Sequence, residues 1–437
     1  MTITGAARDI WRRSPAARIG ITAAAMVLVA EGAVLLLSPG DEGIAPVATE
    51  ADDYFAAEAI ARAREYRGGQ RTLLVVGLGA QALAVGALAV GRPRVARRAL
   101  GKLASRPLAG PAVAGIVVVA VAELASLPTA LAAHERSVDA GLSTQSLASW
   151  LADDARSLAI AAVITAGAAS ALAALVRRHP RGWWLPAAGG ATMLGVALTV
   201  LGPVLIAPQF NRFEELPEGS ALRAGVIELG ERAGVEIGEV YRVDASRRST
   251  MLNAYVDGLG PTKRVVLYDT LIAGTERPAL ESVVAHELGY VASSDIPRGL
   301  AFAALVAPLG MLFSRELASA LARRAGAQPG SVASVPALLL AIAVAASILG
   351  VPGNQLSRRV EASADAFALR LTDDPQALIA VQRTLARRNL ADPEPPGWAR
   401  TLFGTHPTTM ERIGTALAYE RQIPPPEASP SAPFPAG

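Results

Sequence analysis

The chain has 437 residues, of which 51% are hydrophobic and only 18% are charged, and its mean hydropathy is +0.35. This composition is too apolar for an ordinary water-soluble protein of such length and indicates a multi-pass membrane protein. The sequence contains no cysteine, which excludes disulfides, thiolate metal sites and cysteine nucleophiles. The net charge of +3 does not indicate nucleic-acid binding, because the arginines stand mainly beside apolar segments, where they act as topology signals.

Seven apolar stretches are long enough, or nearly so, to cross a lipid bilayer, whose hydrocarbon core takes about 20 helical residues. We therefore expect a mainly α-helical membrane protein. The first stretch follows several arginines and lacks a convincing cleavage site, so we interpret it as an uncleaved anchor. The sixth is the shortest. The stretches are 18–37, 72–91, 109–131, 158–176, 183–206, 298–313 and 335–351.

Two glutamates, Glu31 and Glu123, lie inside these apolar stretches. A carboxylate is costly there unless it faces protein or water. The two residues therefore indicate either a polar cavity within the membrane or a neutral carboxylic acid that hydrogen-bonds between helices.

Lysines and arginines concentrate before the first stretch and in every second loop after it. Because cytoplasmic loops carry the excess of positive charge, this bias predicts a cytoplasmic N-terminus. An odd number of crossings then places the segments after the fifth and seventh stretches on the extracytoplasmic side of the cell membrane.

Between residues 207 and 297 the composition becomes polar and the hydrophobic periodicity changes, which indicates a globular insertion. In this insertion a helix is expected over 220–233, with Ser220 as its cap. Strands at 239–243, 253–256 and 264–268 are expected to form a small sheet, with a hairpin turn at Asp257-Gly258. A helix with Pro278 in its first turn follows. We divide the chain into a membrane region (1–206), a polar insertion (207–297), two further spans (298–353), a C-terminal helical region (354–423) and a disordered tail (424–437).

The C-terminal region shows three helical patterns. One covers 354–372 and carries Glu361 and Asp365 four residues apart, a second covers 375–389, and the last runs through Arg412. A loop with Trp398 and His406 is expected between the second and the last.

The motif that carries chemistry is His286-Glu287-Leu288-Gly289-Tyr290. In an HExxH helix, histidines at i and i+4 lie on one face and bind one zinc ion, while the glutamate acts as the base. Here Tyr290 holds the second histidine position, and a phenol is a poorer zinc donor than imidazole near neutral pH. Glu361 is suited to be the carboxylate ligand from a second helix, and Asp365 can accept the free ring N–H of His286.

The chain resembles the integral-membrane zinc metallopeptidases that include the CAAX prenyl endopeptidases and their bacterial relatives. Matching segments follow one another in the right order and cover most of the chain. They are Gly141–Ser146 with Trp150, Pro208–Phe213, Asn253–Val256, Val266–Leu271, His286–Gly289 with Asp295, Ser357–Ala368, and Thr405–Pro407 with Arg412.

The resemblance implies a fold and a set of roles. The implied fold has about seven transmembrane helices around an intramembrane chamber, capped by a zincin-like catalytic domain with a small β-sheet. The implied activity is hydrolysis of peptides or membrane-protein substrates with one zinc ion. The implied roles are His286 and Glu361 as metal ligands, Glu287 as general base, Asp365 as partner of the ligand histidine, His406 and Arg412 as contacts to the substrate carbonyl, and the strand at Asn253, Ala254 and Tyr255 as the substrate-binding edge.

Tyr290 leaves alternatives open. A phenolate can bind zinc as a longer oxygen donor, and His406 is another candidate ligand. If no zinc binds, the chain is a catalytically silent member that holds membrane peptides as a chaperone or scaffold. A transporter is a third reading, based on seven spans with Glu31 and Glu123, but it leaves the polar insertion without a role.

Overall fold

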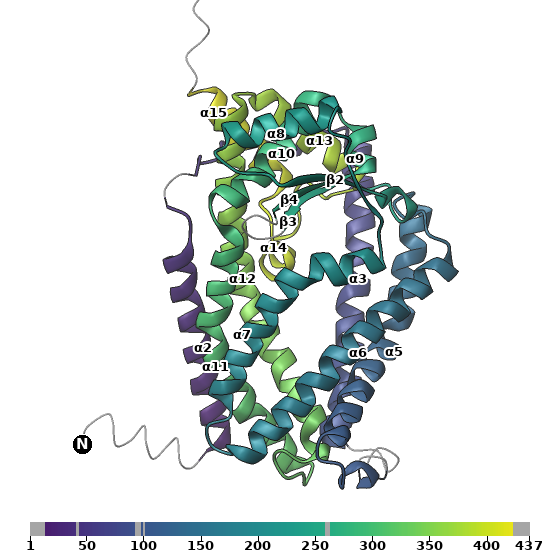
Figure 1. The fold of residues 1–437 in the computed structure, drawn as a ribbon, viewed down its shortest axis with the longest axis vertical. Coiled ribbons are helices and arrows are strands. Elements are labelled where there is room, and N and C mark those ends of the chain that lie inside the picture. Colours follow the sequence, from purple (N-terminus) through teal and green to yellow (C-terminus); the bar gives the residue numbers. More distant parts are fainter. Residues whose placement is uncertain (1–13, 41–42, 92–97, 99–100, 258–262, 423–437) are drawn as a thin grey trace, which may run out of the picture.

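The computed structural model describes residues 14–40, 43–91, 98, 101–257 and 263–422. Long helices run along the length of the molecule, and a small sheet with shorter helices gathers at one end (Figure 1). We call this end the cap; it comprises the sheet, α8, α9, α10, α13 and α15. The predicted tail, 424–437, lies outside the described residues.

Seven helices in the described part of the chain are long and apolar enough to cross a membrane, so the predicted number of spans is confirmed. The sixth is far longer than its apolar stretch, because polar residues extend the helix at both ends. The helices are α2 (Pro15–Leu37), α3 (Ala57–Gly86, continued to Gly91), α5 (Ala109–Asp139), α6 (Leu147–Arg178), α7 (Trp184–Leu201, continued to Gln209), α11 (Asp295–Arg324) and α12 (Val335–Thr372).

Helix α12 (Val335–Thr372) corrects the expectation of a separate helix over 354–372. It runs without a break from the membrane region into the cap and carries Pro352 inside it. A proline removes one backbone hydrogen bond, but packing against neighbouring helices allows a membrane helix to continue through it. As a result, Glu361 and Asp365 stand on the extension of a membrane helix. A second correction concerns the loop at Trp398, which forms a short helix, α14 (Gly397–Phe403).

The cap contains a four-stranded sheet in the order β1-β2-β4-β3. β2 (Glu239–Val243) lies parallel to β4 (Arg264–Tyr268), and β3 (Ala254–Asp257) pairs antiparallel with β4 and forms one edge. These three strands were predicted. Asp257, expected in the turn of the hairpin, is instead the last residue of β3 and pairs with Arg264, and Gly258 lies outside the described residues. β1 (Phe213–Glu215), antiparallel to β2, was not predicted, because three residues with two glutamates carry no strand signal.

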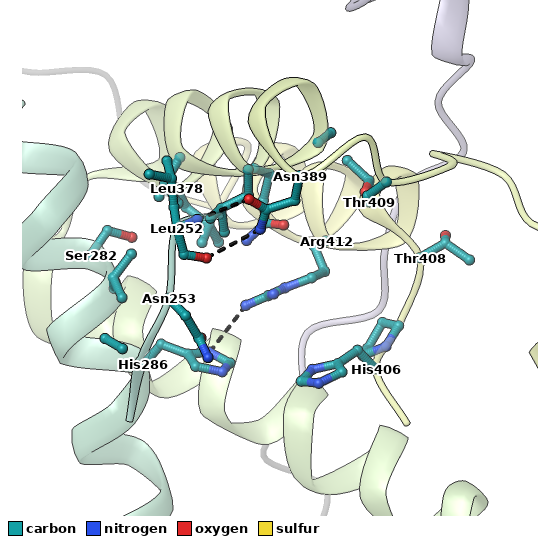
Figure 2. A pocket seen from close by; sticks show the side chains of 18 of the residues that line it. Leu252, Asn253, Ser282, His286, Leu378, Asn389, His406, Thr408, Thr409 and Arg412 are labelled. Carbon is teal, nitrogen blue, oxygen red and sulfur yellow. Dashed lines mark hydrogen bonds between the residues drawn. The ribbon is translucent and has the colours of Figure 1, made fainter. Parts of the chain in front are cut away.

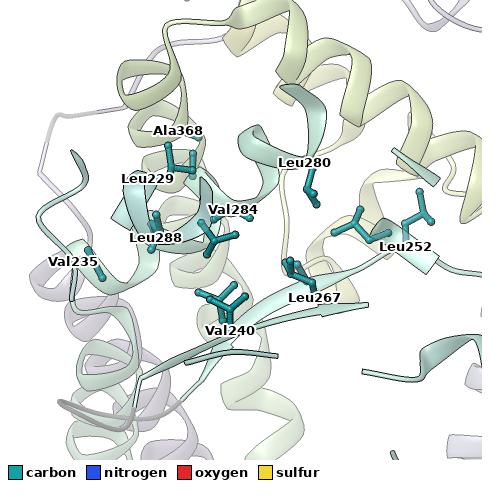
Figure 3. Close-up of a cluster of buried hydrophobic side chains, with 14 residues drawn as sticks. Leu229, Val235, Val240, Leu252, Leu267, Leu280, Val284, Leu288 and Ala368 are labelled. Atoms are coloured by element: carbon teal, nitrogen blue, oxygen red, sulfur yellow. The ribbon is translucent and has the colours of Figure 1, made fainter. Parts of the chain in front are cut away.

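Five helices belong to the cap; α8, α9 and α10 contact the sheet, α13 packs on α10, and α15 packs on α13. They are α8 (Ala221–Arg232), α9 (Asp269–Gly274), α10 (Arg277–Ala292), α13 (Pro375–Arg388) and α15 (Thr409–Glu420). The predicted cap of α8 is confirmed, because the Ser220 hydroxyl accepts the Arg223 N–H. Leu229 of α8 and Leu288 of α10 meet Val240 and Leu267 of the sheet in one buried cluster (Figure 3). Each such side chain stabilises the fold by roughly 1.5–3 kcal/mol, so α10 is held firmly over the sheet.

The segment between α2 and α3 crosses the cap and holds α15. The Val47 N–H donates to the Gly414 carbonyl at 3.1 Å. Gly414 is required here, because a Cβ at this position would lie 2.3 Å from the Val47 carbonyl oxygen. The cap is therefore tied to the membrane helices on this side as well as through α12.

A cavity of about 1120 Å³ opens between the membrane helices. Its lining comes from α2, α3, α5, α6, α12 and α14 and includes both intramembrane glutamates, Glu31 and Glu123, together with Gln81 and Ser347. Both glutamates therefore line a cavity between the membrane helices, as one of the two sequence-based alternatives expects. The side chain of Glu123 also hydrogen-bonds with Asp154 of α6, which is the contact between helices that the other alternative expects.

Candidate functional site

The candidate site forms where α10 crosses α12. Gly289 permits the close approach, because a Cβ there would lie 3.1 Å from Ala364 Cα. The crossing brings His286 of α10 against Glu361 and Asp365 of α12, and all three side chains are at most 8% exposed. Buried polar groups of this kind persist only when they are paired.

His286 is held at both ring nitrogens. Its Nδ1 lies 2.8 Å from Asp365 Oδ1, and its Nε2 lies 3.3 Å from Glu361 Oε2. Asp365 also accepts two hydrogen bonds from Arg412 of α15, at 2.8 Å from Nε and 2.5 Å from Nη2. Arg412 therefore fixes the carboxylate that fixes the His286 ring, and Nε2 is left pointing toward Glu361.

The charges of this cluster set the protonation of His286 and Glu287. Burial and Arg412 lower the pKa of His286, but Asp365 and Glu361 outweigh them and raise it to about 9. Burial raises the pKa of Glu287 to about 7, with Glu361 adding to the effect and His286 and Arg412 opposing it. A carboxyl with a pKa near the working pH has the property that general acid–base chemistry requires.

Tyr290 lies one helical turn after His286 on the same face of α10. Its hydroxyl is 3.3 Å from His286 Nε2, and the two rings meet edge to face at 5.1 Å between centroids. Burial, followed by the Glu361 carboxylate, raises the pKa of Tyr290 well above its usual range. In the metal-free chain the phenol is therefore neutral, whereas a bound divalent cation would favour the phenolate.

These side chains face a cavity of about 370 Å³ between the sheet edge, α10, α13 and the segment that leads into α15 (Figure 2). It brings together most of the residues predicted from the sequence. The predicted residues that line it are Asn253, Ala254, His286, Glu287, Tyr290, His406 and Arg412.

Tyr255, which the sequence analysis included in the substrate-binding strand, is absent from this lining. Alternation along β3 turns it to the other face of the strand, where its ring meets Tyr268 edge to face at 6.4 Å. Burial raises the pKa of its hydroxyl. Only the backbone of Tyr255 therefore remains near the site.

Two lining residues, Gln382 and Asn389, were missed by the sequence analysis. They belong to α13 and its C-terminal end, a segment that matches no motif. The apolar period of α13 indicates its buried face, but the partner of that face is fixed only by the tertiary fold.

Comparison with known proteins identifies the family. Residues 220–420 match the family model described as peptidase family M48, and residues 45–212 match the CAAX prenyl protease N-terminal model with five membrane helices. An uncharacterised metalloprotease of Bacillus subtilis is 30% identical over 305 residues, which cover 69% of this chain and 71% of that protein. The chain belongs to peptidase family M48.

A further relative and a solved structure are also similar to this chain. A CAAX prenyl protease 1 homolog of rice is 31% identical over 229 residues, and the match covers 50% of this chain and about half (52%) of that protein. The crystal structure of Ste24p from S. mikatae shares the fold with a TM-score of 0.68 at 20% identity, covering 93% of this chain and 99% of that one. The resemblance stated from the sequence motifs and the predicted fold class are both confirmed.

M48 membership implies a metal cofactor, and the ligand atoms can be tested for fit. In the described part of the chain, no three His, Cys, Asp or Glu side chains form a group that could hold a metal ion. With Tyr290 counted, the two spacings around His286 fit: its Nε2 lies 3.3 Å from both Tyr290 Oη and Glu361 Oε2, and ligands about 2.0–2.1 Å from a tetrahedral zinc are about 3.3 Å apart. Glu361 Oε2 is buried and, apart from its 3.3 Å contact with His286 Nε2, has no hydrogen-bond partner.

Proposed function

We propose that this M48 member is a membrane-embedded zinc metalloendopeptidase that hydrolyses extended peptides or membrane-protein substrates. The ligands would be His286 Nε2, Glu361 and Tyr290. The single observation that carries the proposal is the position of His286 Nε2, which lies 3.3 Å from both Tyr290 Oη and the buried Glu361 Oε2. When bound, zinc lowers the pKa of a water ligand to about 7 and polarises a carbonyl oxygen.

The surrounding side chains have separate tasks in this proposal. Glu287 lines the cavity with a pKa raised to about 7 by burial, so it can take a proton from water and deliver it to the leaving amine. Asp365 and Arg412 hold the His286 ring. His406 places Nδ1 2.7 Å from Glu361 Oε1 and is 58% exposed, so its ring can reach a substrate oxygen that gains negative charge.

The substrate is expected to bind along β3. This strand pairs with β4 on one side only, and its other edge faces the cavity that contains His286 and Glu287. A peptide added as a further strand is bound through backbone hydrogen bonds, with little demand on its sequence. The proposal therefore names extended peptides as substrates.

One observation favours a second function, a catalytically silent peptide-binding chaperone or scaffold. Tyr290 replaces an imidazole at the third ligand position, and burial raises the pKa of its phenol. If zinc cannot displace that proton, the edge strand and cavity still bind peptides, but no bond is cut.

Zinc content separates the two functions. Purified protein equilibrated with excess zinc and then desalted is expected to retain zinc, and the His286→Ala variant is expected to lose it, because two donors remain. His179→Ala serves as the control, since His179 ends α6, far from the site in sequence and outside its lining. Mass spectrometry of the metal content gives the answer. Absence of zinc in the natural chain would exclude the zinc peptidase and favour the catalytically silent peptide-binding protein.

We also propose that the cap faces the extracytoplasmic side, as the arginine distribution suggests. The cysteine-free chain allows a clean test with single cysteines. In intact cells, Glu218→Cys before α8 should react with an impermeant maleimide, while Gly182→Cys, between α6 and α7, should be protected. The reverse pattern would place the cap in the cytoplasm.

A further inference from the structure

The side chain of Asn389 pairs with the backbone of the segment that leads into β3. Its Oδ1 accepts the Leu252 N–H at 2.9 Å, and its Nδ2 donates to the Leu252 carbonyl at 3.1 Å (Figure 2). A side-chain amide carries a donor and an acceptor side by side, as a peptide backbone does. Asn389 therefore stands where the backbone of a neighbouring strand would stand.

The alternation of backbone groups shows which edge Asn389 occupies. The Asn253 carbonyl accepts the Tyr268 N–H at 3.2 Å, so the backbone groups of Asn253 face β4. Successive residues of a strand direct these groups to opposite edges, and those of Leu252 and Ala254 consequently face the cavity. At this edge the backbone of Leu252 is already paired with the Asn389 side chain. The Val256 N–H donates a hydrogen bond to the Glu287 carboxylate. Ala254 lies between these two positions.

Asn389 is itself held in place from a membrane helix. Arg67 of α3 donates to the carbonyls of Asn389 at 2.6 Å and Leu390 at 2.8 Å. Leu390 adopts φ 45°, a left-handed conformation that is uncommon for a residue with a side chain and persists only where the surroundings impose it. Asp392, two residues on, is paired with Arg71 at 3.1 Å. The position of the Asn389 amide is thus determined by α3.

We propose that Asn389 is a positioning residue that ends the substrate strand at Ala254. A peptide strand that pairs with Ala254 would next pair with the N–H and carbonyl of Leu252, which face the same edge two residues away. The Asn389 side chain already forms hydrogen bonds with both of these groups. Longer peptides must leave the sheet edge at this point, so the site limits the number of paired substrate residues on one side. This inference rests on the proposed peptide binding along β3.

The test measures how peptide affinity depends on length. Fluorescein-labelled peptides of alternating valine and threonine are bound to the full chain in detergent, in a Glu287→Gln background so that none is cut, and the anisotropy is recorded. The parent peptide is compared with versions extended by two residues at its N- or C-terminus. In Asn389→Ala and Asn389→Ser, extension at one terminus of the peptide, but not at the other, should increase affinity. This gain should be about tenfold larger than the gain from the same extension in the parent protein, because two backbone hydrogen bonds become available.

Two further variants separate this effect from general loosening. Asn389→Asp still covers the Leu252 N–H and should show no gain, and Arg387→Ala, exposed near the end of the same helix, should behave as the parent. If the short peptide binds and extension changes its affinity equally in Asn389→Ala, Asn389→Ser and the parent protein, the proposed role of Asn389 is wrong, while peptide binding along β3 stands. Failure of every variant and the parent to bind any peptide would instead overturn peptide binding along β3, and the inference with it.

Discussion

The Tyr290→His variant is expected to bind zinc more than about a hundredfold more tightly than the natural chain and to cut peptides faster by a similar factor. Mutating even a residue that only hydrogen-bonds to a metal ligand typically lowers metal affinity or activity by about 10- to 100-fold. This substitution changes a ligand itself. Imidazole offers a neutral lone pair, whereas the buried phenol next to Glu361 must first lose a proton. Calorimetry with zinc and cleavage of an internally quenched peptide measure the two quantities.

The matched control for this prediction is Tyr290→Phe, which keeps the ring and removes only the hydroxyl that lies 3.3 Å from His286 Nε2. If Tyr290 is the third ligand, this variant should bind zinc more weakly than the natural chain. If Tyr290 only fills the space of a missing ligand, the phenylalanine variant should equal the natural chain, while the histidine variant still gains. No gain in Tyr290→His would mean that Glu361 and His286 are not placed to share a metal ion.

The parts of the fold with a strong periodic signal could be predicted from the sequence. The seven apolar helices, the strands β2, β3 and β4 and the capped helix α8 all carry such signals. The strand β1 is too short and too acidic to be predicted, and the separate helix expected over 354–372 is the continuation of α12. The latter failed because helix packing in a membrane region outweighs a local preference.

The candidate site divides in the same way. His286, Glu287, Glu361 and Asp365 follow motif spacing, and the structure brings them together on two crossing helices. Asn389 could not be predicted, because its contact with Leu252 spans 137 positions of sequence and depends on how Arg67 places the end of α13. The pairing of Arg412 with Asp365 likewise joins α15 to α12 only through the tertiary fold.

The Arg412→Met variant is expected to lose about 3–5 kcal/mol of stability, because removing one partner of a buried ion pair leaves the other charge unpaired. The Asp365 side chain is 1% exposed and that of Arg412 13%. The double variant Arg412→Met/Asp365→Asn should be more stable than Arg412→Met alone, since the carboxylate that lacks a partner is then gone. The fraction of protein that stays folded in detergent, followed by size-exclusion chromatography after heating, ranks the variants.

Arg400→Met provides the comparison for Arg412→Met. Arg400 also pairs with a carboxylate of α15, Glu411, at 2.5 Å, but its side chain is 42% exposed and that of Glu411 30%. Water screens such a pair, so its loss should cost less than about 1 kcal/mol. Equal losses for the two arginines would mean that Arg412 contributes no more than a surface pair. The His286 ring would then owe its orientation to Asp365 alone, and Arg412 would be free to act on a substrate carbonyl as the family resemblance implies.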